Sequence, residues 1–408
     1  MNDRTPVYVV DAVRSPRGRG NEKGSLRGLA PMQLLARTLR RLAMQTNLDP
    51  SALSDLLVGC VTQTADQGAN IGKLAAIAAD WPDNVPAMTV NRYCASGLSA
   101  MNYGALRARE DGGLVVAGGI EMMSRVPMAA DRGPLTHDFG FQAKAGLLPI
   151  GIAADVIAQI HGFSRADCDA WALQSQQRAA AAQDAHRFPS IVPIHGDDDA
   201  LLLAADETPR RSTTAESLAA LPPAFADMAA KYGLDALACK RYGLERLEHV
   251  HHAGNSPAMA DGASAVLLAA EPAVARHDLR PRARILASAE VSVDRTLALT
   301  GSVDATQLAL ERARLAPGDI DLFEVNESFA ALMLHFERAV GISRDRLNVN
   351  GGAIALGHAM GSTGTALVGT LLDELERRGG RYGVVAICGA AGLASATVFE
   401  IQPGPDRS

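Results

Sequence analysis

The sequence predicts an α/β protein whose core is a duplicated βαβ unit, interrupted by a long insertion. Apolar strand-like runs alternate with helical patterns, which is typical of α/β proteins with a largely parallel sheet. Residues 88–124 and 347–395 share one order: a strand, a turn, a helix and a second apolar strand. A chance similarity between two βαβ units is the alternative. The segment between the two copies is more polar than either of them.

Four elements precede the first copy. An apolar run at 7–10 predicts a buried strand, and leucines at helical spacing predict a helix over 32–45. The run LLVGCVTQ at 56–63 predicts a second strand, and 69–80 predicts a second helix. These elements alternate as α/β architecture requires.

The two copies correspond element by element. In the first, Cys94 stands at the turn before an Ala/Gly-rich helix, and the strand 114–117 follows. In the second, a Gly-rich turn precedes a helix over 364–377 and the strand 384–387. Two such halves packed as a pseudo-symmetric pair would bring their strand–helix turns to one side of the molecule.

The insertion is rich in prolines and helical pieces and is expected to cover one face of the core. Such segments often carry specificity while the rigid scaffold carries the chemistry. The predicted domains are an N-terminal core half at 1–120, an inserted loop domain at 121–250, a return to the first half at 251–275 and a C-terminal core half at 276–408.

The composition is that of an ordinary globular protein. Of 408 residues, 48% are hydrophobic and 21% are charged, and aromatic residues make up only 4%, so small side chains dominate the packing. The formal net charge of −6 argues against nucleic acid, which would require a concentrated basic face.

The cysteines and the chain ends favour a cytoplasmic protein. The five cysteines are odd in number and include no C-x-x-C pair, so neither a disulfide framework nor a metal site is expected. A strand pattern begins almost at once, without a signal peptide, and no apolar run approaches the ~20 residues of a membrane span. The final GPDRS is not a peroxisomal address.

Cys94 is the first candidate for chemistry. If a helix begins just after it, free backbone N–H groups and the positive end of the helix dipole face its sulfur. That setting lowers a thiol pKa from ~8.5 and favours the nucleophilic thiolate. Gly97 allows a backbone or a ligand to approach closely. A buried structural cysteine is the alternative, because cysteine is among the most buried residue types.

His358 is the second candidate. It lies in the Gly-rich segment NVNGGAIALGHAMGSTG, where the residue after Gly357 is histidine and not the lysine of a P-loop, so an ATP site is not expected. A histidine before a helix can act as a base or hydrogen-bond donor at physiological pH. A loop histidine satisfied by the backbone is the alternative.

Two further motifs follow strands in the second half. CGAAG brings a second thiol, Cys388, to the end of a strand, with a packing cysteine as the alternative. In LFEVNESFAALML, Asn326 and Glu327 end an apolar strand before an apolar helix. A helix N-cap at Asn-Glu-Ser is the alternative there.

Together these segments resemble the thiolase family, whose members make or break β-ketoacyl thioesters with coenzyme A. The resemblance spans nearly the whole chain and implies a layered α/β/α/β/α fold with a duplicated βαβαβ core and an inserted loop domain that covers CoA and substrate. Six segments carry it in the family's order: VNRYCASGLSA (nucleophile segment), GGIEMMSR, HHAGNSPAMADGASAVLLA, VNESFA (Asn-Glu-Ala-Phe), NVNGGAIALGH (Gly-His) and CGAAG (Cys-x-Gly-x-Gly).

The resemblance implies a role for each motif residue. Cys94 would accept the acyl group, His358 would take its proton, and Cys388 would exchange a proton with the acetyl α-carbon. Asn326, through a water, and His358 would form one oxyanion hole; the backbone N–H groups of Cys94 and Ala390 would form the second. Covalent catalysis lets one acyl group wait while a second thioester enters.

The chain departs from the family pattern at several positions. Ala359 replaces the proline that usually follows the histidine, and Ala390 replaces the first glycine after the second thiol. IGIAAD, beginning at Ile150, stands where Met-Gly-x-Thr-Ala-Glu is common, LALTGSV stands where Met-Gly-x-Gly-Pro is usual, and Pro257 stands where a serine often contacts pantetheine. The reaction type is therefore better supported than the CoA contacts.

Coenzyme A is the expected co-substrate, with no covalently bound cofactor. The candidate contacts are Arg210, Ala253 and Ser256; further basic candidates on the insertion, each with a solvated charged face as the alternative, are Arg211, Lys231 and Lys240. His251 and His252 have no metal-ligand spacing and are interpreted as structural or cleft-lining.

The predicted activity is cleavage of 3-ketoacyl-CoA by CoA to acyl-CoA and acetyl-CoA, in a fatty-acid-degrading role. An acetoacetyl-CoA-specific biosynthetic thiolase and a non-catalytic acyl-CoA or lipid binder are the alternatives. A β-ketoacyl synthase is disfavoured because such enzymes lack the second catalytic cysteine. By resemblance we expect a homodimer or homotetramer.

Overall fold

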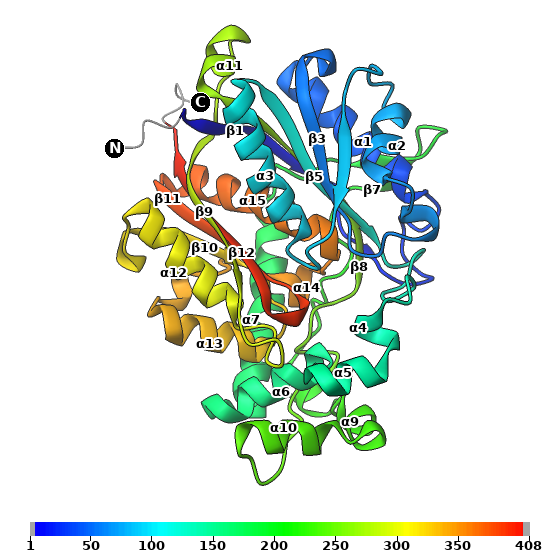
Figure 1. Ribbon diagram of the computed structural model, residues 1–408, viewed down its shortest axis with the longest axis vertical. Coiled ribbons are helices and arrows are strands. Elements are labelled where there is room, and N and C mark those ends of the chain that lie inside the picture. The colour runs from blue at the N-terminus through cyan, green and yellow to red at the C-terminus, as the bar shows by residue number, and fades with distance from the viewer. Residues whose placement is uncertain (1–4, 403–408) are drawn as a thin grey trace.

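A mixed sheet of ten strands runs through the computed structural model, which describes residues 5–402 (Figure 1). The strand order is β10-β11-β12-β9-β1-β8-β5-β3-β4, and β2 pairs with β8. The strands are β1 (Val7–Arg14), β2 (Gly18–Arg19), β3 (Leu53–Gly59), β4 (Ala87–Val90), β5 (Leu114–Met122), β8 (Ala260–Ala270), β9 (Ala283–Ser292), β10 (Leu322–Val325), β11 (Tyr382–Cys388) and β12 (Leu393–Ile401).

The duplication predicted from the sequence is confirmed by the strand pairing. In the first half, β3 lies parallel to β4 and β5, and β8 lies antiparallel to β5 and β1. In the second, β10 lies parallel to β11 and bridges to Leu347, while β12 lies antiparallel to β11 and β9. The two halves meet where Tyr8 and Val9 of β1 pair with β9.

The expectation of a largely parallel sheet is wrong, because most strand pairs are antiparallel. A parallel connection needs a crossover of about a dozen residues or more. The turn between β11 and β12, Ala390–Gly392, is far shorter, so β12 returns antiparallel. In the first half, β8 enters from the insertion and runs antiparallel to β5.

Helices form three layers around the two halves of the sheet. The paired central helices α3 (Ser96–Asp111) and α15 (Met360–Arg378) pack between the halves. The outer helices are α1 (Pro31–Thr46) and α2 (Ile71–Ala78) on the first half, and α12 (Gly301–Ala313) and α13 (Ala330–Val340) on the second. Three buried apolar clusters fill the spaces between these layers, so the predicted α/β/α/β/α order is confirmed.

The insertion forms a helical body below the core in Figure 1. Its α6 and α7 pack against α13, and the Ser164 hydroxyl and Asp167 carboxylate close a capping box at the start of α7. Its elements are α4 (Pro134–His137), α5 (Phe139–Ala145), α6 (Ile150–His161), α7 (Arg165–Asp184), β6 (Ile194–His195), β7 (Leu201–Leu203), α8 (Ala215–Ala219), α9 (Ala226–Tyr232) and α10 (Leu234–Tyr242).

Element boundaries near the turns differ from the predicted ones. The strand predicted over 56–63 ends at Gly59, and β5 extends to Met122, through the glycines where the sequence predicts its end. A Cβ on Gly119 would lie 2.1 Å from the Gly361 carbonyl oxygen, so this strand needs glycine where α15 crosses it. Helix α15 begins at Met360 rather than at 364, which places His358 directly before its first turn.

One apolar stretch was missed at the sequence level. Phe139–His161 has the length and hydropathy of a candidate membrane span, although no run of that kind was expected. In the fold it is divided into α5 and α6, and Ile152, Val156 and Ile157 of α6 are buried in the core. The stretch is thus interpreted as core helix. The C-terminal GPDRS lies outside the described residues.

The remaining helices are short. Helix α11 (Glu271–Arg276) follows β8, and α14 (Ala353–Leu356) lies in the Gly-rich segment before His358.

Candidate active site

The turns that carry the predicted residues converge at the junction of the two halves. A Cβ on Gly97, in the first turn of α3, would lie 2.6 Å from the Gly361 carbonyl oxygen in the first turn of α15. A Cβ on Gly389, next to Cys388, would lie 3.0 Å from the Arg92 carbonyl oxygen. The turn before α3 therefore contacts the turn after Cys388, and the first turn of α3 contacts the first turn of α15, which follows His358.

Cys94 lies in the turn that leads from β4 into α3. Tyr93 before it has φ 48°, a left-handed conformation that is sparsely populated outside glycine and is often found at functional sites. The helix begins at Ser96 as predicted, but burial raises the pKa of the Cys94 thiol, with a further increase from the nearby Cys388. The expected lowering of this pKa is wrong, because desolvation is the largest effect and exceeds the lowering contributed by the Cys94 backbone N–H.

His358 is buried in the turn between α14 and α15. Its backbone N–H donates to the Ala258 carbonyl oxygen at 2.8 Å, and its Nδ1 lies 2.9 Å from Thr363 Oγ1. Within residues 5–402, its Nε2 has no hydrogen-bond partner. Burial, together with a smaller effect of the nearby Arg17 charge, lowers the pKa of His358 to about 3. The ring is therefore neutral at physiological pH.

Cys388 is the last residue of β11, and Asn326 directly follows the neighbouring parallel strand β10. The Cys388 Sγ lies 3.0 Å from Ser328 Oγ, which accepts a hydrogen bond from Asn326 Nδ2 at 2.9 Å. The backbone N–H of Asn326 donates to Ala386 of β11 at 3.0 Å and fixes the turn. Burial raises the pKa of Cys388 to about 11, while the Ser328 bond opposes that increase.

Two buried polar atoms are left without partners among the described residues at this site: Asn326 Oδ1 and His358 Nε2. Buried polar groups in proteins are nearly always hydrogen-bonded, so such exceptions require an explanation. Asn326 and Thr363, the partner of His358, line one small internal cavity. A ligand atom or water held against Asn326 in this cavity would satisfy its free Oδ1.

The turn after Cys388 adopts an unusual backbone. Ala391 has φ 56° and Gly392 has φ 83°, both in the left-handed region. The backbone at Ala390 lies outside that region, so alanine fits there as well as glycine would. Among the described residues the Ala390 N–H has no hydrogen-bond acceptor, and the Cys94 N–H interacts only with its own sulfur. Free N–H groups of this kind are available for an oxyanion.

Two buried carboxylates hold these turns, and the sequence assigned neither of them a role, although it placed Glu327 at the end of an apolar strand. Glu327 accepts hydrogen bonds from Trp171 Nε1 at 2.9 Å, Ser175 Oγ at 2.7 Å and the Ile354 N–H at 3.0 Å. It ties α7 of the insertion to the Gly-rich segment. The N-cap alternative for Asn-Glu-Ser is wrong, because α13 begins after Phe329 without a capping side chain.

The second carboxylate, Glu121, is the next-to-last residue of β5. It accepts from the Val61 N–H at 2.9 Å and from the Thr62 and Gly361 N–H groups at 3.1 Å each. A charged residue after an apolar strand and a Gly-Gly pair was its only sequence signal.

The candidate CoA contacts lie along the insertion. Arg210 Nη2 donates to the Ala253 carbonyl oxygen at 3.2 Å, so these two residues are brought together at the surface. The Ser256 hydroxyl is used internally, donating to the His252 carbonyl oxygen at 2.8 Å. Arg211 pairs with Asp184 at 2.9 Å.

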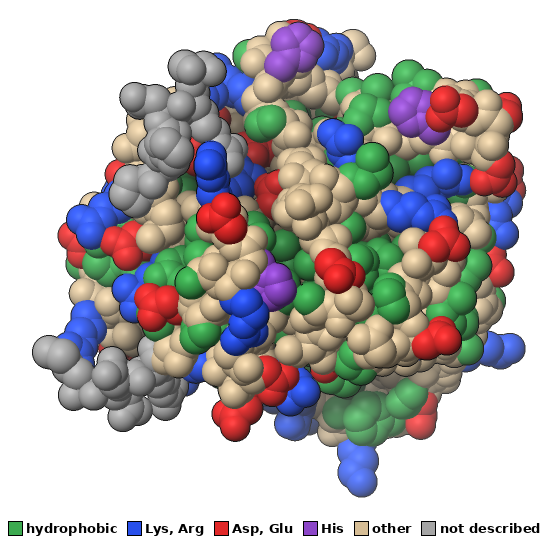
Figure 2. Space-filling model, turned by 90° about the horizontal axis from the view of Figure 1, so that it is seen from above, with side chains coloured by type: hydrophobic (Ala, Val, Ile, Leu, Met, Phe, Trp, Pro, Cys, Tyr) green, Lys and Arg blue, Asp and Glu red, His purple; other side chains and the backbone are tan. Residues whose placement is uncertain are grey.

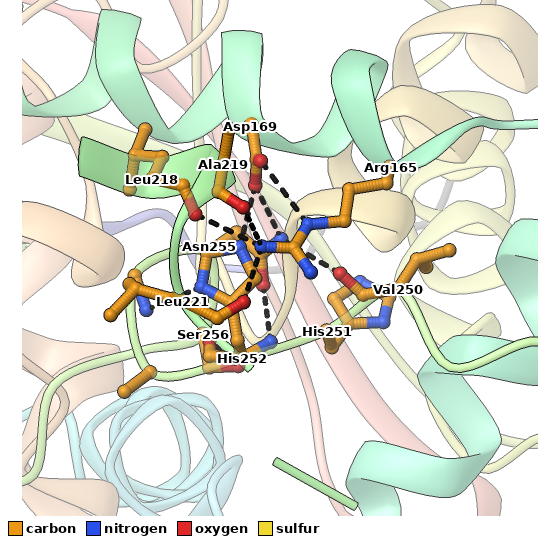
Figure 3. A network of polar contacts seen from close by, with 12 residues as sticks. Arg165, Asp169, Leu218, Ala219, Leu221, Val250, His251, His252, Asn255 and Ser256 are labelled. Atoms are coloured by element: carbon orange, nitrogen blue, oxygen red, sulfur yellow. Dashed lines mark hydrogen bonds and ion pairs between the residues drawn. The ribbon is translucent and has the colours of Figure 1, made fainter. Parts of the chain in front are cut away.

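The adjacent histidines belong to a buried polar network. Figure 3 shows His252 and Asn255 directed toward Asp169, with distances of 2.7 Å from His252 Nε2 and 2.9 Å from Asn255 Nδ2. Arg165 meets the same carboxylate and donates to the carbonyls of Leu218, Ala219 and Leu221. Of the two predictions for these histidines, the contacts support the structural one. Among residues 5–402 no group of three or more His, Cys, Asp or Glu side chains could hold a metal ion.

Comparison with known proteins agrees with this architecture along the whole chain. Residues 7–231 match the family description "Thiolase, N-terminal domain" and residues 279–401 match "Thiolase, C-terminal domain". The chain is 37% identical to 3-ketoacyl-CoA thiolase of Klebsiella pneumoniae and 39% identical to that of Serratia proteamaculans, in each case over 97% of this chain and 99% of the relative.

Solved structures give the same result. Human mitochondrial 3-ketoacyl-CoA thiolase superposes with a TM-score of 0.85 at 31% identity, covering 98% of this chain and 99% of the other. The Bacillus anthracis acetyl-CoA acetyltransferase gives a TM-score of 0.84 at 30% identity, covering 98% and 100%. The chain belongs to the thiolase family. It is thus an acyltransferase of the thiolase class.

Proposed function

We propose that the protein is a 3-ketoacyl-CoA thiolase that catalyses 3-ketoacyl-CoA + CoA ⇌ acyl-CoA + acetyl-CoA. One observation carries the proposal: two thiols, Cys94 and Cys388, lie on contacting turns beside a neutral histidine whose Nε2 is free within the described chain. Relatives named 3-ketoacyl-CoA thiolase, at 37–39% identity, support the substrate class.

In the first half-reaction, Cys94 attacks the substrate. His358 Nε2 takes the thiol proton, and Thr363 holds the other ring nitrogen. A base is needed because burial disfavours a free thiolate at Cys94. Sulfur bonds to the 3-keto carbon, the bond to the acetyl unit breaks, and that unit leaves as an enolate of acetyl-CoA.

In the same step Cys388 protonates the enolate carbon. Its raised pKa keeps it as a proton-bearing thiol. His358 Nε2 and a water held by Asn326 stabilise the enolate oxygen, and the Cys94 and Ala390 N–H groups stabilise the tetrahedral oxyanion. Each preorganised donor typically contributes ~3–4 kcal/mol to the transition state. CoA then takes the acyl group from Cys94.

We assign coenzyme A to the side of the site that the insertion covers, with Arg210, Ala253 and Ser256 as candidate contacts. The Arg210–Ala253 contact at the surface supports this side. Pro257 lacks the hydroxyl and N–H of the serine common in the family, and Ile150 opens α6 where the family pattern differs, so the acyl and pantetheine contacts here are this chain's own.

We assign the enzyme to fatty-acid degradation in the cytoplasm, the setting that its relative 3-ketoacyl-CoA thiolase FadA of Escherichia coli suggests at 37% identity. An acetoacetyl-CoA-specific biosynthetic enzyme is the second candidate, favoured by the match to the Bacillus anthracis acetyl-CoA acetyltransferase. On the face in Figure 2, acidic and basic side chains are interspersed, which supports a small-molecule partner over nucleic acid.

The active form is proposed to be a homodimer or a homotetramer built from such dimers. β4 forms one edge of the sheet, and large apolar side chains are exposed on it and on the adjoining α2 and α3. An unpaired edge with exposed apolar side chains is a template for pairing with a second chain. The exposed residues are Leu74, Ile77, Met88, Tyr103 and Leu106.

Thiolysis across a chain-length series of 3-ketoacyl-CoA substrates tests the function, with Cys94→Ala as the blank. We expect turnover on medium chains above that on acetoacetyl-CoA; the opposite order would favour the biosynthetic candidate. Intact-protein mass after incubation with acetyl-CoA should show one acetyl group, absent in Cys94→Ala. CoA binding without that adduct would favour a non-catalytic binder.

A further inference from the structure

A buried hydroxyl, on Ser328, connects two of the proposed catalytic side chains. Its Oγ lies 3.0 Å from Cys388 Sγ and 2.9 Å from Asn326 Nδ2. The residue is only 5% exposed. The family motif that this segment resembles, Asn-Glu-Ala-Phe, has alanine at this position and cannot make either contact.

The chemistry of the three groups fixes the direction of the bonds. An amide NH₂ only donates, so Ser328 Oγ accepts from Asn326. The single hydroxyl proton is then free to point at Cys388. When Cys388 is a thiolate, its sulfur only accepts, so Ser328 must be the donor. The same contact orients Asn326 so that its Oδ1 is the atom left without a partner within the described chain.

The surroundings of Cys388 make this donor important. Burial is the main effect on its pKa and disfavours the thiolate. The charged groups nearby are committed elsewhere: Arg92 pairs with Glu290 at 2.8 Å, and Glu327 faces α7. The neighbouring titratable groups, Cys94 and His358, are uncharged because burial raises the pKa of the first and lowers that of the second.

Resting on the proposed thiolase activity, we infer that Ser328 is a positioning residue that donates to the Cys388 thiolate and holds it toward the substrate α-carbon while orienting Asn326. In the condensation direction, the thiolate takes a proton from the acetyl α-carbon. The C–H bond breaks, an S–H bond forms, and the electron pair moves to the thioester oxygen as the enolate. The Ser328 hydroxyl keeps its own proton throughout.

The test separates proton transfer at carbon from acyl transfer. In Ser328→Ala, exchange of the acetyl protons of acetyl-CoA with deuterium oxide should fall by about tenfold to a hundredfold at neutral pH, because loss of the donor raises the Cys388 pKa and each unit is tenfold in thiolate. The pH profile of exchange should move to higher pH. Acetylation of Cys94, followed by intact-protein mass, should keep its wild-type rate.

Three variants make the result decisive. Ser328→Thr keeps the hydroxyl and should restore exchange, and Ser328→Cys, with a weaker donor, should give an intermediate rate. Ser190→Ala removes a buried hydroxyl outside the site, beside Asp373, and should leave both rates unchanged.

Unchanged exchange in Ser328→Ala, or an equal fall of exchange and acetylation in a variant with wild-type thermal stability, would overturn the inference. Wild-type protein that never acetylates Cys94 would instead overturn the proposed function.

Discussion

At the scale of single residues, burial rather than nearby charge pairs sets the protonation states of the site. Arg17 is an example next to His358: its Nη1 donates to Ser362 Oγ at 2.7 Å, and its guanidinium is buried. The nearby Asp206 carboxylate is already engaged by Arg14 at 2.7 Å. Burial and the Arg14 charge lower the pKa of Arg17 to about 9.

Replacing Arg17 by methionine should raise the pKa of His358. The positive charge disfavours the imidazolium, so its removal moves the pKa upward from about 3, by up to about one unit, while burial still holds it below the ordinary value. Histidine NMR titration measures this, and the acid limb of kcat/KM should move to higher pH. Arg17→Lys keeps the charge and is the control; identical titrations in Arg17→Met and wild type would contradict the prediction.

The sequence was sufficient to predict which residues form the site, but not to predict their pKa values. The positions of Cys94, His358 and Asn326 at strand–helix turns follow from local patterns. The raised Cys94 pKa depends on how much protein surrounds the thiol, which only the packed turns determine. Glu121, and the role of Glu327, were missed because the partners of these carboxylates are backbone N–H groups and side chains distant in the sequence.

At the scale of elements, Glu121 joins β5 to the turns of both halves. Either oxygen of the carboxylate faces donors: Val61 and Gly361 N–H on one, Thr62 N–H and Gln67 Nε2 on the other. In Glu121→Gln, the new NH₂ must face two donors in either orientation. We expect a loss of about 2–3 kcal/mol in unfolding free energy. Urea denaturation measures it, and a wild-type midpoint would contradict the role.

The close crossing of α15 over β5 gives a second prediction at this scale. In Gly119→Ala, the added Cβ would lie 2.1 Å from the Gly361 carbonyl oxygen, a backbone atom that cannot move alone. Overpacking of this kind typically costs about 1–3 kcal/mol and would displace the turn before His358, so thiolysis should fall as well. Gly318→Ala is the control, because its Cβ meets no atom within 4 Å. Unchanged thiolysis in Gly119→Ala would show that the backbone at the crossing can shift to accommodate the added methyl group.

Helices and strands were largely predictable from periodicity, but sheet direction was not. The helix expected at 32–45 is observed as Pro31–Thr46, because its leucine spacing is a local signal. Whether β12 runs parallel or antiparallel to β11 depends on the short turn at Ala390–Gly392, which in sequence resembles the start of another crossover.

At the scale of the whole molecule, the site exists only where the two halves and the insertion meet. One half supplies Cys94 and the other supplies His358 and Cys388, while the insertion contacts the site through Trp171 and Ser175 of α7, which donate to the buried Glu327. The repeated order of elements predicted this convergence. The division at 121–250 remains a prediction, since it depends on how the insertion folds and not on a local pattern.

Asp155 of α6 anchors the insertion to the segment that returns to the core. Its carboxylate is fully buried and lies 2.7 Å from both His249 Nδ1 and His251 Nδ1. Removing one partner of a buried pair typically costs about 3–5 kcal/mol. In Asp155→Asn, hydrogen exchange over α6 and α10 should therefore rise more than exchange over β11, because the insertion loses its attachment before the core opens.

The same contacts predict how attachment depends on pH. Burial raises the pKa of Asp155, but hydrogen bonds from His249 and His251 outweigh it and leave the pKa below its ordinary value. The stability that Asp155 contributes is therefore present above the ordinary aspartate pKa and is lost as pH falls through the lowered one. The hydrogen bond with Asp155 raises the pKa of His249. The stability that this contact contributes is fully present below the pKa of His249 in the unfolded chain and is lost as pH rises through its pKa in the folded protein.

His252 acts oppositely: burial lowers its pKa, so its contribution is full above the ordinary histidine value and is lost as pH falls through the lowered one. Its carboxylate partner, Asp169, lies on α7, so the pH dependence of α6 follows Asp155 and His249. Protection of α6 should thus be greatest between the ordinary aspartate and histidine pKa values, roughly pH 4 to 6.5, and should decline on both sides. Hydrogen exchange across that range measures it, with β11 as the internal reference. A flat profile in wild type, or an unaltered one in Asp155→Asn, would mean that apolar packing of α6 alone holds the insertion.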